Sequence, residues 1–443
     1  MTPVEPTGAS HDVAPHELFF STTDAKGIIK QANSVFVRLS RFSREQLVGA
    51  PHNIIRHPAM PGGAFLLMWL TLQQGKPFCA YVDNLAADGS QYTVFATVTP
   101  LGDDYLSVRA RPAVGALLDA ARGLYAATRP LELEARANGA SAHDAAVAGL
   151  ERLAHLLGEA GIPSYDAFIQ QALPAEVAAR AGATERRSAD GPLGQLLAET
   201  QQLRNSLGAW VAQLDELQKL ADDLVQGGAD LQRATVAGEE SVQEISEALA
   251  RSEGFSPLSG MLSLWAQMTP EVASHVTPLA GRLEELRSRT ADTRFRIALA
   301  ALHSETVEQF VGELIDGGPG SDEARPAILD LTRALHEGIA EASTALSQHT
   351  QLANAVADEA QQIVSLMRIP TTVLATWQAM AAGQDDAITA LLPTAAEVVD
   401  RGIADAERLL ALAERCRAVE VGSPDEILTH LRQVEESTGQ LQL

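Results

Sequence analysis

Apolar and polar positions follow two different periods along the chain, and the period changes near residue 112. Before that point, short runs rich in apolar and β-branched residues are separated by turns that contain Gly or Asp, which is typical of β-strands. The runs cover residues 18–23, 28–31, 78–85, 91–101 and 104–111. Asp88-Gly89 between the third and fourth runs is a strong hairpin signal. We therefore expect five strands, of which the first two also form a hairpin.

The segment between the second and third strands predicts short helices. Asn33 and Ser43 are typical N-caps and begin the first two, over residues 33–40 and 43–47. A further helix begins at Pro61, and its apolar stripe consists of Phe65, Met68, Trp69 and Leu72. Two strands, short helices and three strands predict an α+β domain whose antiparallel sheet packs one face on the helices.

After residue 112 the sequence is rich in Ala, Leu, Glu, Gln and Arg, which favours helix. Helices are expected at roughly 114–127, 141–160, 165–183, 192–252, 258–316, 322–368, 384–415 and 425–440. Apolar positions from Leu196 to Leu224 alternate spacings of four and three, the heptad pattern of helices that pack lengthwise. A shorter stripe runs from Phe295 to Leu314. The expected fold class is thus multidomain: a five-stranded antiparallel sheet with short flanking helices, followed by an all-α bundle or coiled coil.

Charge supports this division. Residues 1–112 contain nine acidic and nine basic side chains, so the net charge of −24 lies entirely in residues 113–443, whereas 11 of the 20 aromatic residues lie in 1–112. We expect a flexible N-terminal lead at 1–16, an α+β domain at 17–112, a helical linker region at 113–190 and a long-helix output region at 191–443.

The same composition argues against several classes of protein. An excess of acidic residues without a basic stripe disfavours nucleic acids and anionic membranes as partners. Two distant cysteines, Cys79 and Cys416, exclude a disulfide framework and a Cys-rich zinc site. The longest uncharged runs are too short and too polar for a membrane span, and residues 1–16 do not resemble a signal peptide. We expect a cytoplasmic protein.

Specific motifs in the α+β domain resemble the PAS domain of aerotaxis receptors. They are Ser21–Ile29, Ala32-Asn33, Phe42–Gly49, Pro51-His52-Asn53-Ile54-Ile55-Arg56-His57-Pro58, Met60-Pro61, Trp69, Gly75-Lys76-Pro77, Asn84, Asp88-Gly89 and Val98-Thr99-Pro100. The resemblance covers about residues 17–112. It implies a PAS sensor that holds FAD between its sheet and a helical flap, and that reports redox state or oxygen to the chemotaxis machinery.

The resemblance also implies residue roles. In that family the Arg and His of the Arg-His-Pro motif, the helix Trp and the Asn of the first helix contribute to the flavin pocket. These residues correspond to Arg56, His57, Trp69 and Asn33 here, with His52, Asn53 and Asn84 as further candidates. Arginine offers a forked donor for pyrophosphate or a flavin carbonyl, amides can meet the polar edge of the ring, and tryptophan can stack on it. The family usually has Asp at Ala59 and commonly Trp at Phe78.

Each candidate also has a purely structural interpretation. Trp69 on an apolar helical face can be a core residue, His52 and His57 can cap helix ends, and Arg56 can pair with a local carboxylate. A haem pocket, which other PAS domains use, would employ His57 as axial ligand. The specific motif favours flavin.

The helical region carries no recognisable catalytic motif. A phosphate-binding loop, a His-Glu-x-x-His motif, a calcium loop and kinase ATP boxes are missing from its sequence, so we expect no enzyme and no metal site. Glu239-Glu240 and Asp222-Asp223 are expected on solvated helix faces, and His303 is expected to be a surface histidine rather than a phosphoacceptor.

The long helices resemble the helical hairpin of methyl-accepting receptors, in a divergent form that lacks the Glu-Ala-Ala-Arg-Ala-Gly-Glu tip. The leading hypothesis is a cytosolic signal-transduction sensor in which a flavin-bearing PAS domain changes the packing of a helical output. Its expected partners are proteins of a signalling pathway, such as the chemotaxis kinase and coupling proteins, and a second copy in a homodimer. The alternative is a non-enzymatic scaffold whose PAS domain mediates dimerisation or partner binding without a cofactor.

Overall fold

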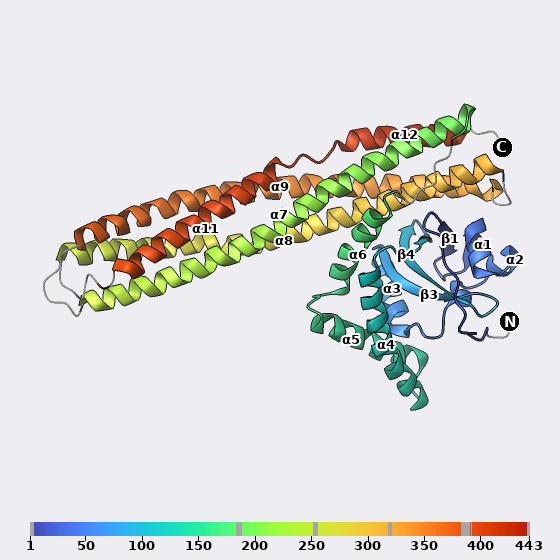
Figure 1. Ribbon diagram of the computed structural model, residues 1–443, viewed down its shortest axis with the longest axis horizontal. Coiled ribbons are helices and arrows are strands. Elements are labelled where there is room, and N and C mark those ends of the chain that lie inside the picture. The colour runs from blue at the N-terminus through green and yellow to red at the C-terminus, as the bar shows by residue number, and fades with distance from the viewer. Residues whose placement is uncertain are drawn as a thin grey trace. The chain divides into compact units, whose positions relative to one another are not determined.

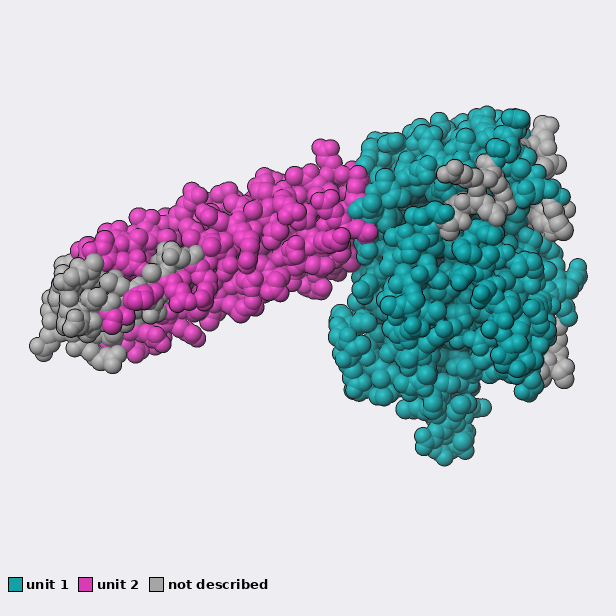
Figure 2. Space-filling model, viewed as in Figure 1, with its two compact units in different colours: residues 1–212, 294–342, 422–443 teal, residues 213–293, 343–421 magenta. Residues whose placement is uncertain are grey.

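The computed structural model describes residues 4–182, 188–250, 256–317, 321–381, 390 and 392–440. The chain forms two compact units (Figure 2). Unit 1 contains residues 1–212, 294–342 and 422–443, and unit 2 contains residues 213–293 and 343–421. Three helices contribute residues to both units: α7 (Gly191–Ala250), α8 (Ser256–Asp316) and α9 (Ser321–Ala381).

The N-terminal part of unit 1 contains an antiparallel sheet (Figure 1). Its five strands have the order β2-β1-β5-β4-β3. The strands are β1 (Leu18–Asp24), β2 (Ile29–Ala32), β3 (Phe78–Leu85), β4 (Gln91–Leu101) and β5 (Asp104–Ala110). Strands β1 and β5 pair along their whole length, which brings the first and last strands together at the centre of the sheet. The strands agree with the predicted runs to within one or two residues.

Short helices cover one face of the sheet. They are α1 (Ser34–Ser40), α2 (Arg44–Leu47), the 3₁₀-helix η1 (His52–Ile55) and α3 (Gly62–Gln73). Phe19 of β1 stacks on Phe36 of α1 with ring centroids 5.5 Å apart, and both lie in a buried apolar core with Tyr92. The predicted fold class, a five-stranded antiparallel sheet with flanking helices followed by long helices, is confirmed.

Later helices of unit 1 cover the opposite face of the sheet. Phe20 of β1 packs edge-to-face against Phe310 of α8, with ring centroids 5.2 Å apart. The Gln309 side chain accepts a hydrogen bond from the backbone N–H of Leu18 at 2.7 Å and donates one to its carbonyl oxygen at 2.8 Å. The sheet is therefore buried on both faces, whereas the sequence predicts helices on one face only.

Three linker helices follow the sheet: α4 (Gly115–Ala137), α5 (Ala142–Glu159) and α6 (Tyr165–Arg180). Glu132 of α4 is 1% exposed and accepts hydrogen bonds from the N–H groups of Gly62 and Gly63, so it caps the N-terminus of α3. Helices α3 and α5 touch at Gly63, where an added Cβ would lie 2.4 Å from the backbone nitrogen of Leu150. Only glycine permits this approach.

A second buried carboxylate binds the backbone that follows the last strand of the sheet. Glu176 of α6 accepts hydrogen bonds from the Tyr81 hydroxyl at 2.7 Å, from Ala113 N–H at 2.6 Å and from Val114 N–H at 3.0 Å. Glu132 and Glu176 together fasten the linker helices to the sheet domain at two separate places.

The helical pattern predicts burial well. All nine heptad positions from Leu196 to Leu224 are buried, as are all six positions of the stripe from Phe295 to Leu314. Two helices are longer than predicted, because α4 continues through Pro130 and α9 continues through Pro370. A proline removes one intrahelical hydrogen bond, and the packing on either side holds the helix together. The predicted helix ends at 183 and 252 and the predicted start at 384 lie outside the described residues.

The remaining helices are α11 (Leu392–Ala418) and α12 (Pro424–Gln440). The predicted exposure of Asp222-Asp223 and Glu239-Glu240 is confirmed. Among the residues that the structure describes, no helix combines the length and apolar character that a membrane crossing requires.

Part of the N-terminal lead is described and lies against the β3–β4 hairpin. Thr7 N–H donates to the carbonyl oxygen of Gly89 at 2.9 Å, and His11 Nδ1 lies 3.0 Å from Ser90 Oγ. Val13 is buried in the apolar core. The predicted domain boundaries at 16, 112 and 190 stay predictions.

Candidate functional site

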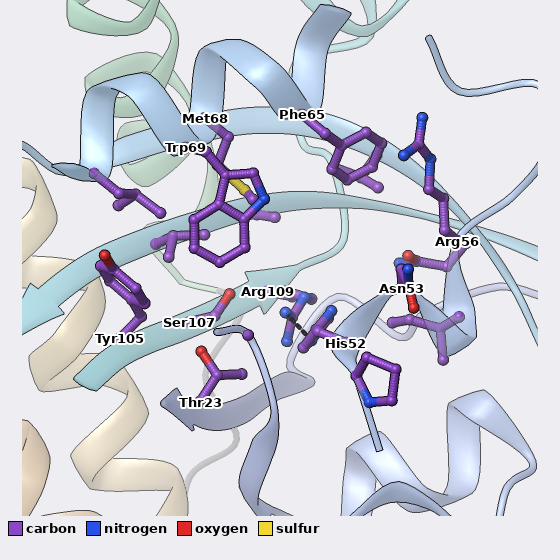
Figure 3. Close-up of a pocket in the computed structure, with 18 of the residues that line it drawn as sticks. Thr23, His52, Asn53, Arg56, Phe65, Met68, Trp69, Tyr105, Ser107 and Arg109 are labelled. Atoms are coloured by element: carbon purple, nitrogen blue, oxygen red, sulfur yellow. Dashed lines mark hydrogen bonds between the residues drawn. The ribbon is translucent and has the colours of Figure 1, made fainter. Parts of the chain in front are cut away.

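A cavity of about 330 Å³ lies between α3 and the sheet (Figure 3). Its walls come from η1, α3, the turn after β1 and strands β1, β3, β4 and β5. Ligand pockets in proteins have volumes of roughly 300–1,000 Å³. The cavity is therefore large enough for a planar ring system but not for a whole dinucleotide.

Helix α3 forms an apolar wall of the cavity with Phe65, Met68 and Trp69 (Figure 3). The Trp69 indole packs edge-to-face against Tyr105 of β5, with ring centroids 5.7 Å apart. At Gly27 an added Cβ would lie 3.2 Å from the indole, so the turn after β1 fits closely against Trp69. Trp69 therefore serves both the core and the cavity wall.

Arg56 follows η1, and its guanidinium lies over the Phe65 ring with Cζ 4.0 Å from the ring centroid. It donates one hydrogen bond to the Met60 carbonyl oxygen at 3.2 Å. Partial burial lowers its pKa. No carboxylate of the described residues forms an ion pair with it, and the contact with Met60 uses only one of its five N–H donors.

Asn84 of β3 lines the cavity and is 3% exposed. Its Nδ2 has no hydrogen-bond partner within the described part of the chain. Buried amide donors in native proteins nearly always have a partner, and Asn84 Nδ2 is available to an acceptor in the cavity.

Asn33 and His57 do not line the cavity. The Asn33 amide caps α1: its Oδ1 accepts from the N–H groups of Phe36 and Phe20, and its Nδ2 donates to the Leu18 carbonyl oxygen. His57 Nδ1 accepts from Ala59 N–H at 3.2 Å. Of the seven residues predicted to contact a cofactor, the structure brings five to the cavity: Arg56, Trp69, His52, Asn53 and Asn84.

Sequence reasoning misses Arg109 of β5, which is 5% exposed and lines the cavity. Its Nη1 donates to Ser21 Oγ at 3.1 Å, and its Nη2 contacts His52 Nε2 (Figure 3). A guanidinium can only donate, so His52 Nε2 is the acceptor and the neutral ring carries its proton on Nδ1. Burial, and secondly the Arg109 charge, hold the pKa of His52 well below its usual value. Burial lowers the pKa of Arg109 to about 10.

The signal for Arg109 is the two-residue period of β5. Tyr105, Ser107 and Arg109 all line the cavity, whereas Leu106 and Val108 between them face the other side of the sheet. The alternation is visible in the sequence. Which face meets the cavity depends on pairing with β1, more than 80 residues earlier.

The Lys, Arg, Asp and Glu residues that line the cavity are all of one sign. It contains Lys26, Arg56 and Arg109 and no Asp or Glu, in a chain whose net charge is −24. A partly enclosed cavity with cations and without carboxylates has a positive potential and favours an anionic ligand.

The two departures from the family pattern occupy different environments. Ala59 is exposed, on the chain between η1 and α3. Phe78 is buried beside the cavity wall, in a cluster with Leu72 and Trp69, and stacks on Tyr165 of α6 with ring centroids 5.2 Å apart. The linker helix thus supplies a second ring where the family commonly has a larger indole.

The prediction that His303 is a surface residue is wrong. His303 of α8 is 2% exposed, because this part of α8 is enclosed between the sheet and other helices of unit 1. It lines a small cavity of about 70 Å³ with Thr99 and Pro100 of β4. Burial lowers its pKa to about 4.

Comparison with known proteins places the likeness in the N-terminal region. This region is 38% identical over 104 residues to the aerotaxis receptor of Escherichia coli, covering 22% of this chain and 21% of the receptor. A nitrogen fixation regulatory protein of Klebsiella pneumoniae is 33% identical over 81 residues, 18% of this chain and 16% of that protein. The aligned segments thus span about a fifth of these relatives or less. No protein-family model matches the sequence.

Proposed function

We propose that residues 17–112 are a PAS sensor domain that binds FAD, and that the chain is a signal-transduction protein reporting redox state or oxygen through its helices. The observation that carries the proposal is the cavity: three cations, no carboxylate and the orphan Asn84 donor surround a space the size of a planar ring. The likeness to an aerotaxis receptor over the same region supports it.

The residues present fit FAD. Phe65, Met68 and Trp69 offer apolar surface to an isoalloxazine ring, and Asn84 Nδ2 offers a hydrogen bond to a ring carbonyl. Lys26 is exposed at the turn after β1, and with Arg56 it is suited to the pyrophosphate that extends beyond the ring. Bound FAD would supply reversible reduction. The roles of Asn33 and His57 as direct ligands remain predictions.

The linker helices give the cavity a physical connection to the helical region. Helix α3 lines the cavity and is capped by Glu132, and β5 leads directly to the Ala113–Val114 segment held by Glu176. A ligand that changes the position of α3 or β5 would alter these contacts. We further propose a non-enzymatic, cytoplasmic homodimer whose partners are proteins of a signalling pathway, such as the chemotaxis kinase and coupling proteins.

The absorbance spectrum of the purified full chain tests the proposal. We expect the oxidised-flavin spectrum, bleached by dithionite, and release of FAD on denaturation. Trp69→Ala and Asn84→Ala should lose flavin, whereas Arg38→Gln, an exposed residue paired with Glu17, should retain it. A colourless protein that takes up no FAD on refolding refutes FAD binding. A Soret band would instead indicate haem.

Size-exclusion chromatography separates the sensor from the cofactor-free scaffold. If Asn84→Ala loses flavin and its oligomeric state and partner binding stay unchanged in every redox condition, the scaffold is the better description.

A further inference from the structure

Arg109 is a buried cation without a counter-ion. It lies on the central strand β5, and none of the carboxylates that the structure describes forms an ion pair with it. Its hydrogen-bond partners are the neutral Ser21 and His52, and its guanidinium lies 5.3 Å and 5.4 Å from the ring centroids of Phe19 and Phe36.

A guanidinium has five N–H donors, and the described contacts of Arg109 use two nitrogens. Aromatic faces and neutral acceptors compensate only part of the free energy lost when such a charge leaves water. The cavity is the side from which an anionic group can complete the compensation, because Arg109 lines it and no carboxylate does. The ligand itself is therefore the missing negative charge.

We propose that Arg109 determines the charge state of the bound ring: it stabilises the reduced flavin as the anion deprotonated at N1, and it disfavours the neutral form protonated there. This inference rests on the proposed binding of FAD. Arg56 and Lys26 serve the pyrophosphate, which is charged in every redox state, so their contribution does not distinguish reduced from oxidised cofactor. Arg109 is the cation that makes this distinction.

The redox step is balanced by an external reductant. A two-electron donor such as dithionite supplies two electrons, and one proton from solvent is taken up at N5. With FAD bound, N1 of the reduced ring would remain unprotonated, and Arg109 would supply the counter-charge for the resulting anion. His52 stays neutral throughout, because its Nε2 accepts from Arg109, so Arg109 alone of this pair can balance a negative charge on the ring.

The test compares the full chain with Arg109→Gln, Arg109→Lys and the control Arg111→Gln, an exposed arginine two residues further along. Each is loaded with FAD, titrated with dithionite under anaerobic conditions, and followed by absorbance at several pH values. In Arg109→Gln the affinity for reduced FAD should fall about tenfold to a hundredfold relative to that for oxidised FAD, since one charged hydrogen bond is lost. Arg109→Lys should recover part of the difference, and Arg111→Gln should match the parent chain.

A second readout uses the parent chain alone and does not depend on the folding of a variant. The pH dependence of its midpoint should show one proton taken up per two electrons at mildly acidic pH, where free reduced flavin takes up two. Two protons in the parent chain, or an unchanged affinity ratio in a folded Arg109→Gln protein, overturns the role of Arg109 while FAD binding stands. A parent chain that binds no FAD overturns the proposed function and this inference together.

Discussion

Two buried arginines of unit 1 have opposite surroundings. Arg180 of α6 pairs with Glu305 of α8 at 2.8 Å and also donates to the Pro15 carbonyl oxygen at 3.0 Å, all in a buried contact between helices and the N-terminal lead. Arg109 lines the cavity with neutral neighbours only. The helical contacts also include Arg204 with Glu308, so carboxylates are present where arginines serve packing. The lining of the cavity offers Arg109 no carboxylate, so a bound anionic ligand would supply its counter-charge.

Removal of the carboxylate from the paired arginine should have the largest effect. Glu305→Gln leaves the Arg180 charge buried without a counter-charge, and we expect a loss of about 3–5 kcal/mol in unfolding free energy. Urea titration followed by circular dichroism measures it. Lys30→Gln, which breaks the exposed pair with Asp104, should lose about 0–1 kcal/mol. Equal effects of the two substitutions would contradict a structural role for the buried pair.

Low pH should destabilise the protein through His303, a histidine of unit 1 whose pKa is lowered by burial alone. His303 has a folded-state pKa of about 4, below the ordinary value of 6.5, so the unfolded chain binds a proton first as pH falls. Its contribution is intact above pH 6.5 and is lost as pH falls toward 4, by up to about 3 kcal/mol. In His303→Gln this part of the pH dependence of stability should disappear. Parallel pH profiles for the two proteins would exclude the assignment.

Glu176 is a buried carboxyl group whose described partners are neutral donors, whereas Glu305 is paired with an arginine. Glu176→Gln should destabilise the protein by about 1–3 kcal/mol, because an amide cannot accept from Tyr81, Ala113 and Val114 equally well. Hydrogen exchange at Ala113 and Val114 should accelerate in the variant. Exchange that stays as slow as in the parent chain would show that Glu176 is dispensable for this junction.

The smallest effect is expected at Arg109 in the absence of ligand. Arg109→Gln removes an uncompensated buried charge, so the stability of the cofactor-free protein should change by less than ~1 kcal/mol or rise. The same urea titration measures it, with Arg180→Gln as the matched arginine that should lose several times more. A large loss in Arg109→Gln would mean that Arg109 is a packing residue like Arg180.

Local sequence features predict the elements of this fold and five of the residues that line its cavity. The heptad from Leu196 to Leu224 is buried throughout, because helical periodicity needs only neighbouring residues. Arg56 and Trp69 belong to a motif recognisable in sequence, and both line the cavity. Arg109 and His303 could not be assigned in this way, since their burial depends on the distant partners β1 and α9.

The contact at Gly63 has a mechanical consequence. Backbone touches backbone there, between the helix that walls the cavity and α5, with no side chain that could rotate to absorb a displacement. A shift of α3 by a few tenths of an ångström would pass to α5 undamped, and the Glu132 cap would move with it. Glycine at this position thus couples the movement of α3, which walls the cavity, to that of α4 and α5.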